Sequence, residues 1–488
     1  MKVLFSPVYI TTPHFETELE LMLNHVSSGD VVYVLQCNKQ LFSCELNPNH
    51  TKSNCHICKS KFRKGTSMIA NIKILQYPNL KINYGILKDK FRDIEELKNY
   101  SIEGINIGLG VASTLISQFN GEHELNTIKY SEEINIKLKT AYYLLTVIKN
   151  TVSNIEPDLF YIFNSRYATT LPIVQFCEQN YLPYYTHERA GKLDKANLIY
   201  RSTPHSIKYA CSEIEELWNA GSDNREQIGA SFFIERRNRV TQGWFSHTTN
   251  QKVNLLPSQF PKHKTVISIF NSSIQEYAAL FRWGNNFRFF SDEYNCLSTI
   301  FDFFKEDENI QFYLRIHPSL IGLDNTQTKQ LKNYISKYRN VIVISPESKI
   351  DTYALIDNSD KIIVLGSTVG AEASYWGKPV IALGRAPYEN LDCCYWPNSL
   401  EELIQLIKAD LRPKEKLSAI KYGYWELARG TDFKYYKPET LFRGKFLNEY
   451  ISLNKFQKII YYFLRILELK NLKALFNAMG EKFKNYQL

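Results

Sequence analysis

Three short segments in the second half of this 488-residue sequence combine residue types that bind phosphate and nucleotide groups. These types are a guanidinium, an imidazole, hydroxyls and a glycine that lets the backbone approach a ligand closely. N–H and O–H donors hold phosphate oxygens, and a nearby carboxylate accepts hydrogen bonds from ribose hydroxyls. The three segments are residues 315–318, 366–372 and 271–276.

The first segment places Arg315 and His317 beside Pro318. Pro318 restrains the loop, and His317 can donate a hydrogen bond to a phosphate oxygen or pack beside a base. A His-Pro pair is often structural. Its position at the end of an expected strand favours a ligand role here, because doubly wound sheets bind ligands at the carboxyl ends of their strands.

The second segment contains Gly366, Ser367, Thr368 and Glu372. Gly366 permits a tight strand-to-helix turn, and the two hydroxyls stand beside exposed backbone amides. Glu372, one helical turn further on, is placed to accept hydrogen bonds from a ribose. A capping box is the structural alternative, but that motif needs a separation of three residues, and Glu372 fits neither candidate cap.

The third segment contains Ser272 and Ser273 and is expected to open a helix that includes Glu276. Hydroxyls and free N–H groups at a helix N-terminus suit a phosphate, because the helix dipole favours negative charge there. An ordinary serine N-cap explains the same pattern, and both interpretations stay open.

Two strand ends in the first half offer candidate catalytic residues for the opposite wall of a cleft. Glu188 is a candidate general base for an acceptor hydroxyl, and His187 is a second one. Arginines in the same segments can balance the charge of a sugar carboxylate or a phosphate. The structural alternative is a set of surface or interdomain salt bridges. The candidates are Asn164, Arg166, His187, Glu188 and Arg189.

Four cysteines follow the spacing C-x6-C-x10-C-x2-C within a polar insertion at residues 37–66. Four thiolates suit a tetrahedral zinc ion or an iron–sulfur cluster, and a closed set of four ligands implies a structural site. A set of free thiols is the alternative. The four residues are Cys37, Cys44, Cys55 and Cys58.

The elements that must position these residues alternate between short β-rich runs and longer helical patterns. This alternation predicts an α/β fold with mainly parallel sheets. A break in the pattern at residues 243–264 indicates a linker. We therefore expect a first Rossmann-like domain at 1–245, a second at 246–415 with strands near 265–270, 311–316, 341–345, 361–365 and 379–383, and a helical segment at 416–488.

The composition is that of a folded chain, with 44% hydrophobic and 22% charged residues. The net charge of +9 is modest for the length, and basic residues are interspersed with acidic ones, so nucleic acid is not an expected partner. The N-terminal residues lack the pattern of a secretion signal, and no apolar stretch approaches the roughly 18 residues of a spanning helix. These features predict a cytoplasmic protein.

Residues 454–484 interleave apolar side chains with lysines, as in a basic amphipathic helix or helix pair. Such a segment can lie on an anionic membrane surface, or it can pack back on the protein core, here on the first domain. The first alternative predicts a peripheral location at the inner membrane, which suits an enzyme that acts on a lipid-linked glycan.

Residues 315–318, the 366–372 turn and residues 377–384 resemble the nucleotide-binding half of capsule polysaccharide biosynthesis proteins. That family includes Kdo transferases and has the GT-B fold, in which two Rossmann-like domains face a cleft. The resemblance covers roughly residues 265–410. It implies that His317, Ser367 and Thr368 hold the nucleotide or phosphate of a sugar donor, such as a CMP-sugar.

The leading hypothesis is a glycosyltransferase that moves a sugar from a nucleotide-activated donor to a growing surface glycan. A CMP-linked acidic sugar such as Kdo is a candidate donor. The sequence shows no D-x-D metal motif at a suitable strand end, which favours a metal-independent transfer step. Alternatives are a UDP-GlcNAc 2-epimerase type of enzyme, a CDP-polyol phosphotransferase and a non-catalytic polysaccharide-binding module.

Overall fold

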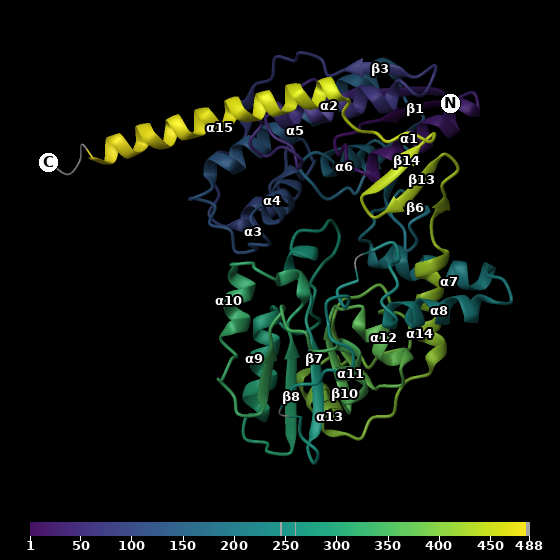
Figure 1. Cartoon of the computed structure of the whole chain (residues 1–488), viewed down its shortest axis with the longest axis vertical. Helices are drawn as coiled ribbons and strands as arrows, with labels where there is room; N and C mark the ends of the chain where they lie inside the picture. The colour runs from purple at the N-terminus through teal and green to yellow at the C-terminus, as the bar shows by residue number, and fades with distance from the viewer. Residues whose placement is uncertain (245, 259, 485–488) are drawn as a thin grey trace.

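The computed structural model describes residues 1–244, 246–258 and 260–484, and over these residues the chain forms two α/β units (Figure 1). The sheet of the first unit has the strand order β12-β6-β5-β4-β1-β2-β3, in which β12 is the short strand Thr431–Asp432. Strands β1 to β5 run parallel, and β6 is antiparallel to β5. The bounds are β1 Lys2–Phe5, β2 Val31–Gln36, β3 Lys73–Gln76, β4 Leu159–Phe163, β5 Tyr184–Arg189 and β6 Lys195–Tyr200.

Helices cover the faces of this first sheet because its central strands are apolar on both sides. All of β4 is buried, as expected for a parallel strand between two helical layers. The long helix α5 ends at Ile155, and Asp158 then accepts a hydrogen bond from the backbone N–H of Lys2 at 2.6 Å. The covering helices are α1 His14–Ser27, α2 Lys52–Thr66, α4 Ile107–Gln118, α5 Ser131–Ile155 and α6 Leu171–Gln179.

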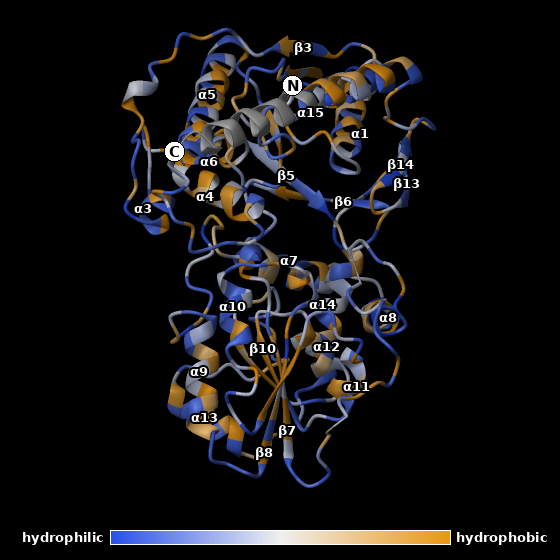
Figure 2. Cartoon of the chain, turned by 60° about the vertical axis from the view of Figure 1, so that its left-hand side comes forward, coloured by the Kyte–Doolittle hydropathy of each residue, from blue (hydrophilic) through white to orange (hydrophobic). Residues whose placement is uncertain are grey.

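The sheet of the second unit has the order β11-β10-β7-β8-β9 and is parallel throughout. Figure 2 shows its strands as hydrophobic ribbons enclosed by helices. The strands expected from the sequence are confirmed to within one or two residues. They are β7 Thr265–Phe270, β8 Ile310–Arg315, β9 Val341–Ile344, β10 Lys361–Leu365 and β11 Val380–Gly384.

The helices of the second unit are α9 Glu293–Phe304, α10 Thr326–Lys332, α11 Thr352–Asp357, α12 Val369–Tyr375 and α13 Leu400–Lys408. Together the two units form the predicted α/β architecture of two Rossmann-like domains. In the second unit, the loops that follow the carboxyl ends of β7, β8 and β10 are those that carry the three motif segments.

The chain enters the second unit earlier than the expected linker at 243–264. Helices α7 (Ile207–Ala220) and α8 (Arg225–Arg237) pack against α14 (Lys416–Ala428). Their buried residues Ile214 and Phe233 belong to the same apolar cluster as the second sheet. These helices therefore belong to the second core.

The C-terminal segment returns to the first unit, and it is not entirely helical. Strand β12 (Thr431–Asp432) pairs with β6, and the hairpin of β13 (Tyr436–Thr440) and β14 (Arg443–Phe446) packs near α1. The final helix α15 (Lys455–Lys484) lies along α2 at its start and then extends beyond the rest of the molecule (Figure 1). Side chains of α15 are described as far as Leu469.

Within the described ranges, the helices lack the combination of length and apolarity that a membrane crossing requires.

Candidate functional site

The loops at the carboxyl ends of β7, β8 and β10 enclose a cavity, here called the strand-end pocket. The structure therefore brings together the sequence motifs that lie far apart in the chain. Segment 246–251 and helices α8 and α11 close its other side. Its polar lining comprises Arg236, Ser246, His247, Thr248, Gln251, Asn271, Arg315, His317, Thr352, Tyr353, Ser367, Thr368 and Glu372, and Pro318 also lines it.

His317 is held as a neutral imidazole at the edge of this pocket. Its Nδ1 accepts a hydrogen bond from the backbone N–H of Ser319 at 3.2 Å, so the ring proton belongs on Nε2. Burial lowers the pKa of His317 to about 4. Its own backbone N–H donates to Asn271 Oδ1 at 2.8 Å, which ties the β8 loop to the β7 loop. The Nε2–H group is then a donor of fixed position.

Arg315 carries a buried charge at the base of the pocket. Its Nη1 and Nη2 donate to the carbonyl oxygens of Ser345 and Ser348 at 3.0 and 3.1 Å, so the side chain also braces the loop after β9. Its Nε is buried without a hydrogen-bond partner among the described atoms. Burial lowers the pKa of Arg315 to about 10, which leaves it charged at neutral pH. An anion in the pocket would relieve this uncompensated charge.

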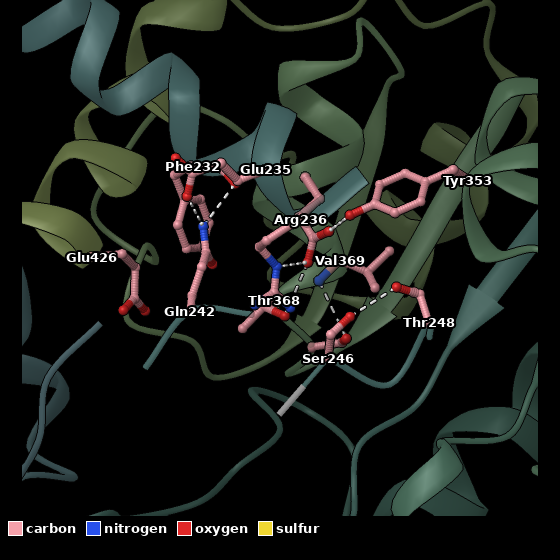
Figure 3. Close-up of polar contacts among 12 residues, drawn as sticks. Phe232, Glu235, Arg236, Gln242, Ser246, Thr248, Tyr353, Thr368, Val369 and Glu426 are labelled. Atoms are coloured by element: carbon pink, nitrogen blue, oxygen red, sulfur yellow. Dashed lines mark hydrogen bonds and ion pairs between the residues drawn. The ribbon is translucent and has the colours of Figure 1, made fainter. Parts of the chain in front are cut away.

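Glu372 organises the opposite side of the pocket, where Figure 3 labels its partners Arg236, Tyr353 and Thr368. Its carboxylate accepts hydrogen bonds from Arg236 Nε at 3.2 Å, Tyr353 Oη at 2.5 Å and Thr368 Oγ1 at 3.3 Å. The residue therefore fixes Arg236 and Thr368 at the pocket rim. That Glu372 accepts a hydrogen bond from a ribose hydroxyl stays a prediction, and the ribose would compete with these three donors.

Gly366 allows the β7 and β10 loops to meet. Its φ of +87° lies in the left-handed region, and a Cβ at this position would stand 3.0 Å from the carbonyl oxygen of Arg385 and 3.6 Å from Ser272 Oγ. A larger residue would thus strain the backbone and crowd the neighbouring loop. Ser367 is buried, and Thr368 is exposed at the rim.

The segment with Ser272 and Ser273 does not open the expected helix. Residues Ile274–Glu276 form a single 3-10 turn, so the helix-dipole argument for a phosphate site at Ser272 and Ser273 was wrong. The turn is anchored instead from below: Gln327 accepts from the backbone N–H of Ile274 at 3.1 Å and donates to the Ser272 carbonyl at 2.8 Å. Ser273 is buried.

The strand-end pocket opens into a cleft of about 380 Å³ between the two units, since four residues line both spaces. These shared residues are Arg236, His247, His317 and Thr368. The second unit contributes Ser272, Glu276 and Gly366 to the cleft, and the first unit contributes Glu188, Arg189 and His205. The structure therefore places Glu188 and Arg189 opposite the motif loops, as the sequence predicted.

Glu188 is the centre of a set of polar residues on the first unit, here called the Glu188 cluster. Its Oε2 accepts from Asn164 Nδ2 at 2.5 Å, and its Oε1 accepts from the backbone N–H of Arg189 at 2.9 Å and lies 3.5 Å from His14 Nδ1. Burial opposes ionisation of Glu188, but His14 and these two donors outweigh it and lower its pKa. Burial also lowers the pKa of His14 to about 4, so a carboxylate stands beside a neutral imidazole at neutral pH.

The backbone of the Glu188 cluster is strained where β4 ends. Asn164 and the next residue, Ser165, both adopt left-handed conformations, with φ of 54° and 72°. Non-glycine residues in this region cost about 1–3 kcal/mol each and often occur at active sites. The strain turns the Asn164 amide toward Glu188, and Asn164 Oδ1 lies 3.4 Å from His205 Nε2.

Two of the predicted catalytic residues do not reach the cleft. His187 is completely buried, and its Nε2 lies 3.2 Å from Glu18 on α1, so its assignment as a base was wrong. Neighbouring side chains of a strand point to opposite faces, and Glu188 takes the cleft side. Arg166 is also buried: it donates to Ser113 Oγ and to the carbonyl oxygen of Gln275, both at 2.8 Å, and thereby joins the two units.

Glu276 has a different environment from Glu188 on the facing wall. Its side chain contacts solvent in the cleft, yet the protein walls around it disfavour its charge. This desolvation raises the pKa of Glu276 to about 7, and the nearby Arg166 only partly offsets it. Two carboxyl groups with pKa values shifted in opposite directions line one cleft, which is a common arrangement for acid and base roles.

The predicted cysteine metal site is not formed in the described residues, where no group of three or more His, Cys, Asp or Glu side chains is arranged to hold a metal ion. Cys37 and Cys44 pack against one apolar cluster, and Cys58 packs against another. Burial raises the pKa of Cys58 to about 12 and also raises that of Cys44. Cys55 Sγ accepts a hydrogen bond from Asn47 at 3.2 Å.

Sequence reasoning missed several residues of the site. Arg236 and Tyr353 come from helices α8 and α11, where a single polar residue carries no visible signal. His205 follows an antiparallel strand, to which the strand-end rule does not apply. His14 could have been found, because it begins the first helix after the carboxyl end of β1.

The family model described as "Capsule polysaccharide biosynthesis protein" matches residues 280–402. This region contains β8 to β11 and the loops with His317, Ser367 and Thr368. The match confirms the resemblance that the motifs at 315–318, 366–372 and 377–384 indicated. No curated protein sequence matches the chain.

Similar solved structures include two from Thermosulfurimonas dismutans and one from Methanocaldococcus jannaschii. The KpsC beta Kdo 2,4 transferase of Thermosulfurimonas dismutans is 15% identical to this chain, with a TM-score of 0.39. The match covers 64% of this chain and 88% of that protein. The KpsC beta Kdo 2,7 transferase of the same organism is 15% identical with a TM-score of 0.35, over 68% and 96%. The UDP-GlcNAc 2-epimerase of Methanocaldococcus jannaschii is 10% identical, with a TM-score of 0.29. The match covers 86% of this chain and 97% of that protein. These values are too low to argue for an activity.

Proposed function

We propose, from its relationship to capsule polysaccharide biosynthesis proteins, that the chain is a glycosyltransferase that transfers a sugar from a nucleotide-activated donor to a glycan acceptor. One observation carries this proposal: the strand-end pocket opens into the cleft through Arg236, His247, His317 and Thr368. A donor held in the pocket would extend its sugar toward Glu188 on the facing wall. That is the geometry a group transfer requires.

The strand-end pocket supplies donors and positive charge for a nucleotide phosphate. The Nε2–H of His317 can donate to a phosphate oxygen, and the Thr368 hydroxyl can do so when its proton turns away from Glu372. The buried charge of Arg315 and the rim charge of Arg236 favour an anion. This arrangement supports phosphate binding. The nucleobase of the donor is to be identified by experiment.

Glu188 would act as general base. The acceptor hydroxyl gives its proton to a Glu188 carboxylate oxygen as its oxygen bonds to the anomeric carbon, and the bond from that carbon to the donor phosphate breaks. The negative charge moves onto the departing phosphate, where Arg236 and His317 can stabilise it. Asn164 and His14 hold the Glu188 carboxylate in position.

The donor sugar is proposed to be acidic, as in CMP-linked Kdo. Arg189 lines the cleft, with its guanidinium 4.8 Å from the Phe442 ring centroid, and can pair with a sugar carboxylate. The match to capsule polysaccharide biosynthesis proteins does not favour the epimerase alternative. The opposite pKa shifts of Glu188 and Glu276 support a catalytic cleft over a binding module.

A two-step experiment tests this function. Thermal-shift screening with CMP, CDP, UDP and GDP and their sugar conjugates identifies the nucleotide, and the selected donor is then incubated with capsule oligosaccharides. We expect stabilisation by one nucleotide class and transfer of its sugar, detected by mass spectrometry of the glycan. Lack of response to every nucleotide would favour the binding module, and turnover of a donor without an acceptor product would favour an epimerase.

A further inference from the structure

The face formed by α2 and the start of α15 combines a basic cavity with an exposed apolar stripe. Apolar side chains recur on α15 at Phe456, Ile459, Phe463 and Ile466, which is helical spacing, and their exposed fractions are 69%, 65%, 60% and 51%. Such spacing places them along one side of the helix. Figure 2 shows this apolar character in the described part of α15.

The stripe faces away from the protein because the other side of α15 is attached to α2. His56 Nε2–H donates to the carbonyl oxygen of Gln457 at 3.0 Å. Further along, Glu468 accepts from the backbone N–H groups of Lys52 and Ser53 at 2.6 and 3.1 Å and from Ser53 Oγ at 2.6 Å. The hydrogen bonds that attach α15 to α2 are thus made by polar groups, and its free side is apolar. An amphipathic helix that packs on its own protein normally buries its apolar side, whereas α15 leaves that side exposed.

The basic cavity lies where this stripe begins. Its lining includes Lys39, Lys59 and Arg63, together with Phe456 and Ile460 of α15. Burial and the neighbouring charges of Arg63 and Lys39 lower the pKa of Lys59, so the three cations repel one another. Lys455, Lys458 and Arg465 add positive charge along the exposed surface of α15. A cavity with cations and apolar carbon side by side matches an anionic headgroup joined to an acyl chain.

We propose that this face docks on an anionic phospholipid bilayer, with the apolar stripe of α15 among the acyl chains and a lipid phosphate between Lys39, Lys59 and Arg63. The physical basis is apolar burial at the interface combined with attraction between basic side chains and the negative membrane surface. A second copy of the chain would offer the same three cations and so would not neutralise them. The inference does not depend on the transferase activity, since it uses a different surface from the cleft.

Vesicle flotation of the full chain tests the proposal, with phosphatidylcholine vesicles that contain or lack phosphatidylglycerol. The wild type is expected to float with the anionic vesicles and to remain at the bottom with the neutral ones. The double variant Ile459→Glu and Phe463→Glu is expected to bind the anionic vesicles about tenfold more weakly or worse. In the double variant Lys59→Glu and Arg63→Glu, the affinity for the anionic vesicles is expected to fall about fivefold for each basic side chain removed.

Control variants carry the same kind of change at single exposed positions of the second unit: Ile335→Glu for the apolar stripe and Lys332→Glu for the basic cavity. Both should float like the wild type, and all variants should keep the wild-type melting temperature, because the substituted side chains are at the surface. Equal flotation with neutral and anionic vesicles would overturn the proposal. So would a dimer in light scattering that the Ile459→Glu and Phe463→Glu variant dissociates, in the absence of vesicle binding.

Discussion

In the strand-end pocket, loops that follow parallel strands hold the polar groups, and these loops are tied to one another through side chain to backbone hydrogen bonds. His317 and Asn271 connect β8 to β7, and Arg315 connects β8 to the loop after β9. In the Glu188 cluster, groups from α1 and β4 converge on one carboxylate at a strained turn. The first arrangement is suited to binding a ligand in a fixed place, and the second to maintaining an ionised base.

The largest expected effect on activity follows the removal of the proposed general base, Glu188. Glu188→Gln keeps the hydrogen bond from the Arg189 N–H but cannot accept a proton, so kcat should fall by about 10²- to 10⁴-fold. Donor binding should stay unchanged, because Glu188 lies on the wall opposite the pocket. Initial-rate kinetics measure the effect, and Glu306→Gln, an exposed carboxyl on the second unit, is the matched control. Near-normal turnover of a folded Glu188→Gln protein would rule out the base assignment.

A binding defect is expected from His317→Ala. The variant loses one charge-assisted hydrogen bond to the donor phosphate, which is worth about 1.5–3 kcal/mol, or roughly a tenfold to hundredfold rise in Kd. Because burial lowers the pKa of His317 to about 4, donor binding should not depend on this residue's titration between pH 6 and pH 8. Isothermal titration checks both points. A variant that binds donor normally but turns over slowly would move His317 from binding to catalysis.

The tight contact between the loops is tested by Gly366→Ala and Gly377→Ala. Both glycines have positive φ, at 87° and 77°, so both changes strain the backbone by about 1–3 kcal/mol. A Cβ at Gly366 also meets Arg385 and Ser272, whereas one at Gly377 meets nothing within 4 Å. Thermal melts should show destabilisation of both variants, and titration should show weaker donor binding only for Gly366→Ala. Equal donor affinity in the two variants would contradict the loop contact.

The smallest expected effect concerns pH and Glu276. Its pKa of about 7 makes the carboxyl mostly neutral below pH 7 and mostly anionic above it. An anionic donor is repelled by the charged form, so the KM for the donor should rise about threefold as the pH increases through 7. Glu276→Gln should abolish this rise, and Glu306→Gln should keep it. If the pH profile of Glu276→Gln matches that of the wild type, another group titrates.

The sequence predicted the strand-end pocket better than the Glu188 cluster. Parallel strands such as 265–270 and 361–365 are continuous apolar runs, and the residue after each run is placed by the sheet. His187 and Glu188 are adjacent in sequence, so only the strand's register decides which one faces the cleft. Helix α8 belongs to the second core because it packs against α14, a long-range contact that a sequence pattern does not show. Arg236 and the start of the second unit therefore could not be predicted from the sequence.

The division of roles between pocket and cluster is tested most directly by titrating the identified donor nucleotide into Glu188→Gln and His317→Ala and measuring transfer by both. We predict that Glu188→Gln binds the donor with a Kd close to that of the wild type and transfers its sugar about 10²-fold more slowly or worse. His317→Ala should lose about tenfold or more in affinity. Lost binding in Glu188→Gln together with unchanged binding in His317→Ala would contradict the account.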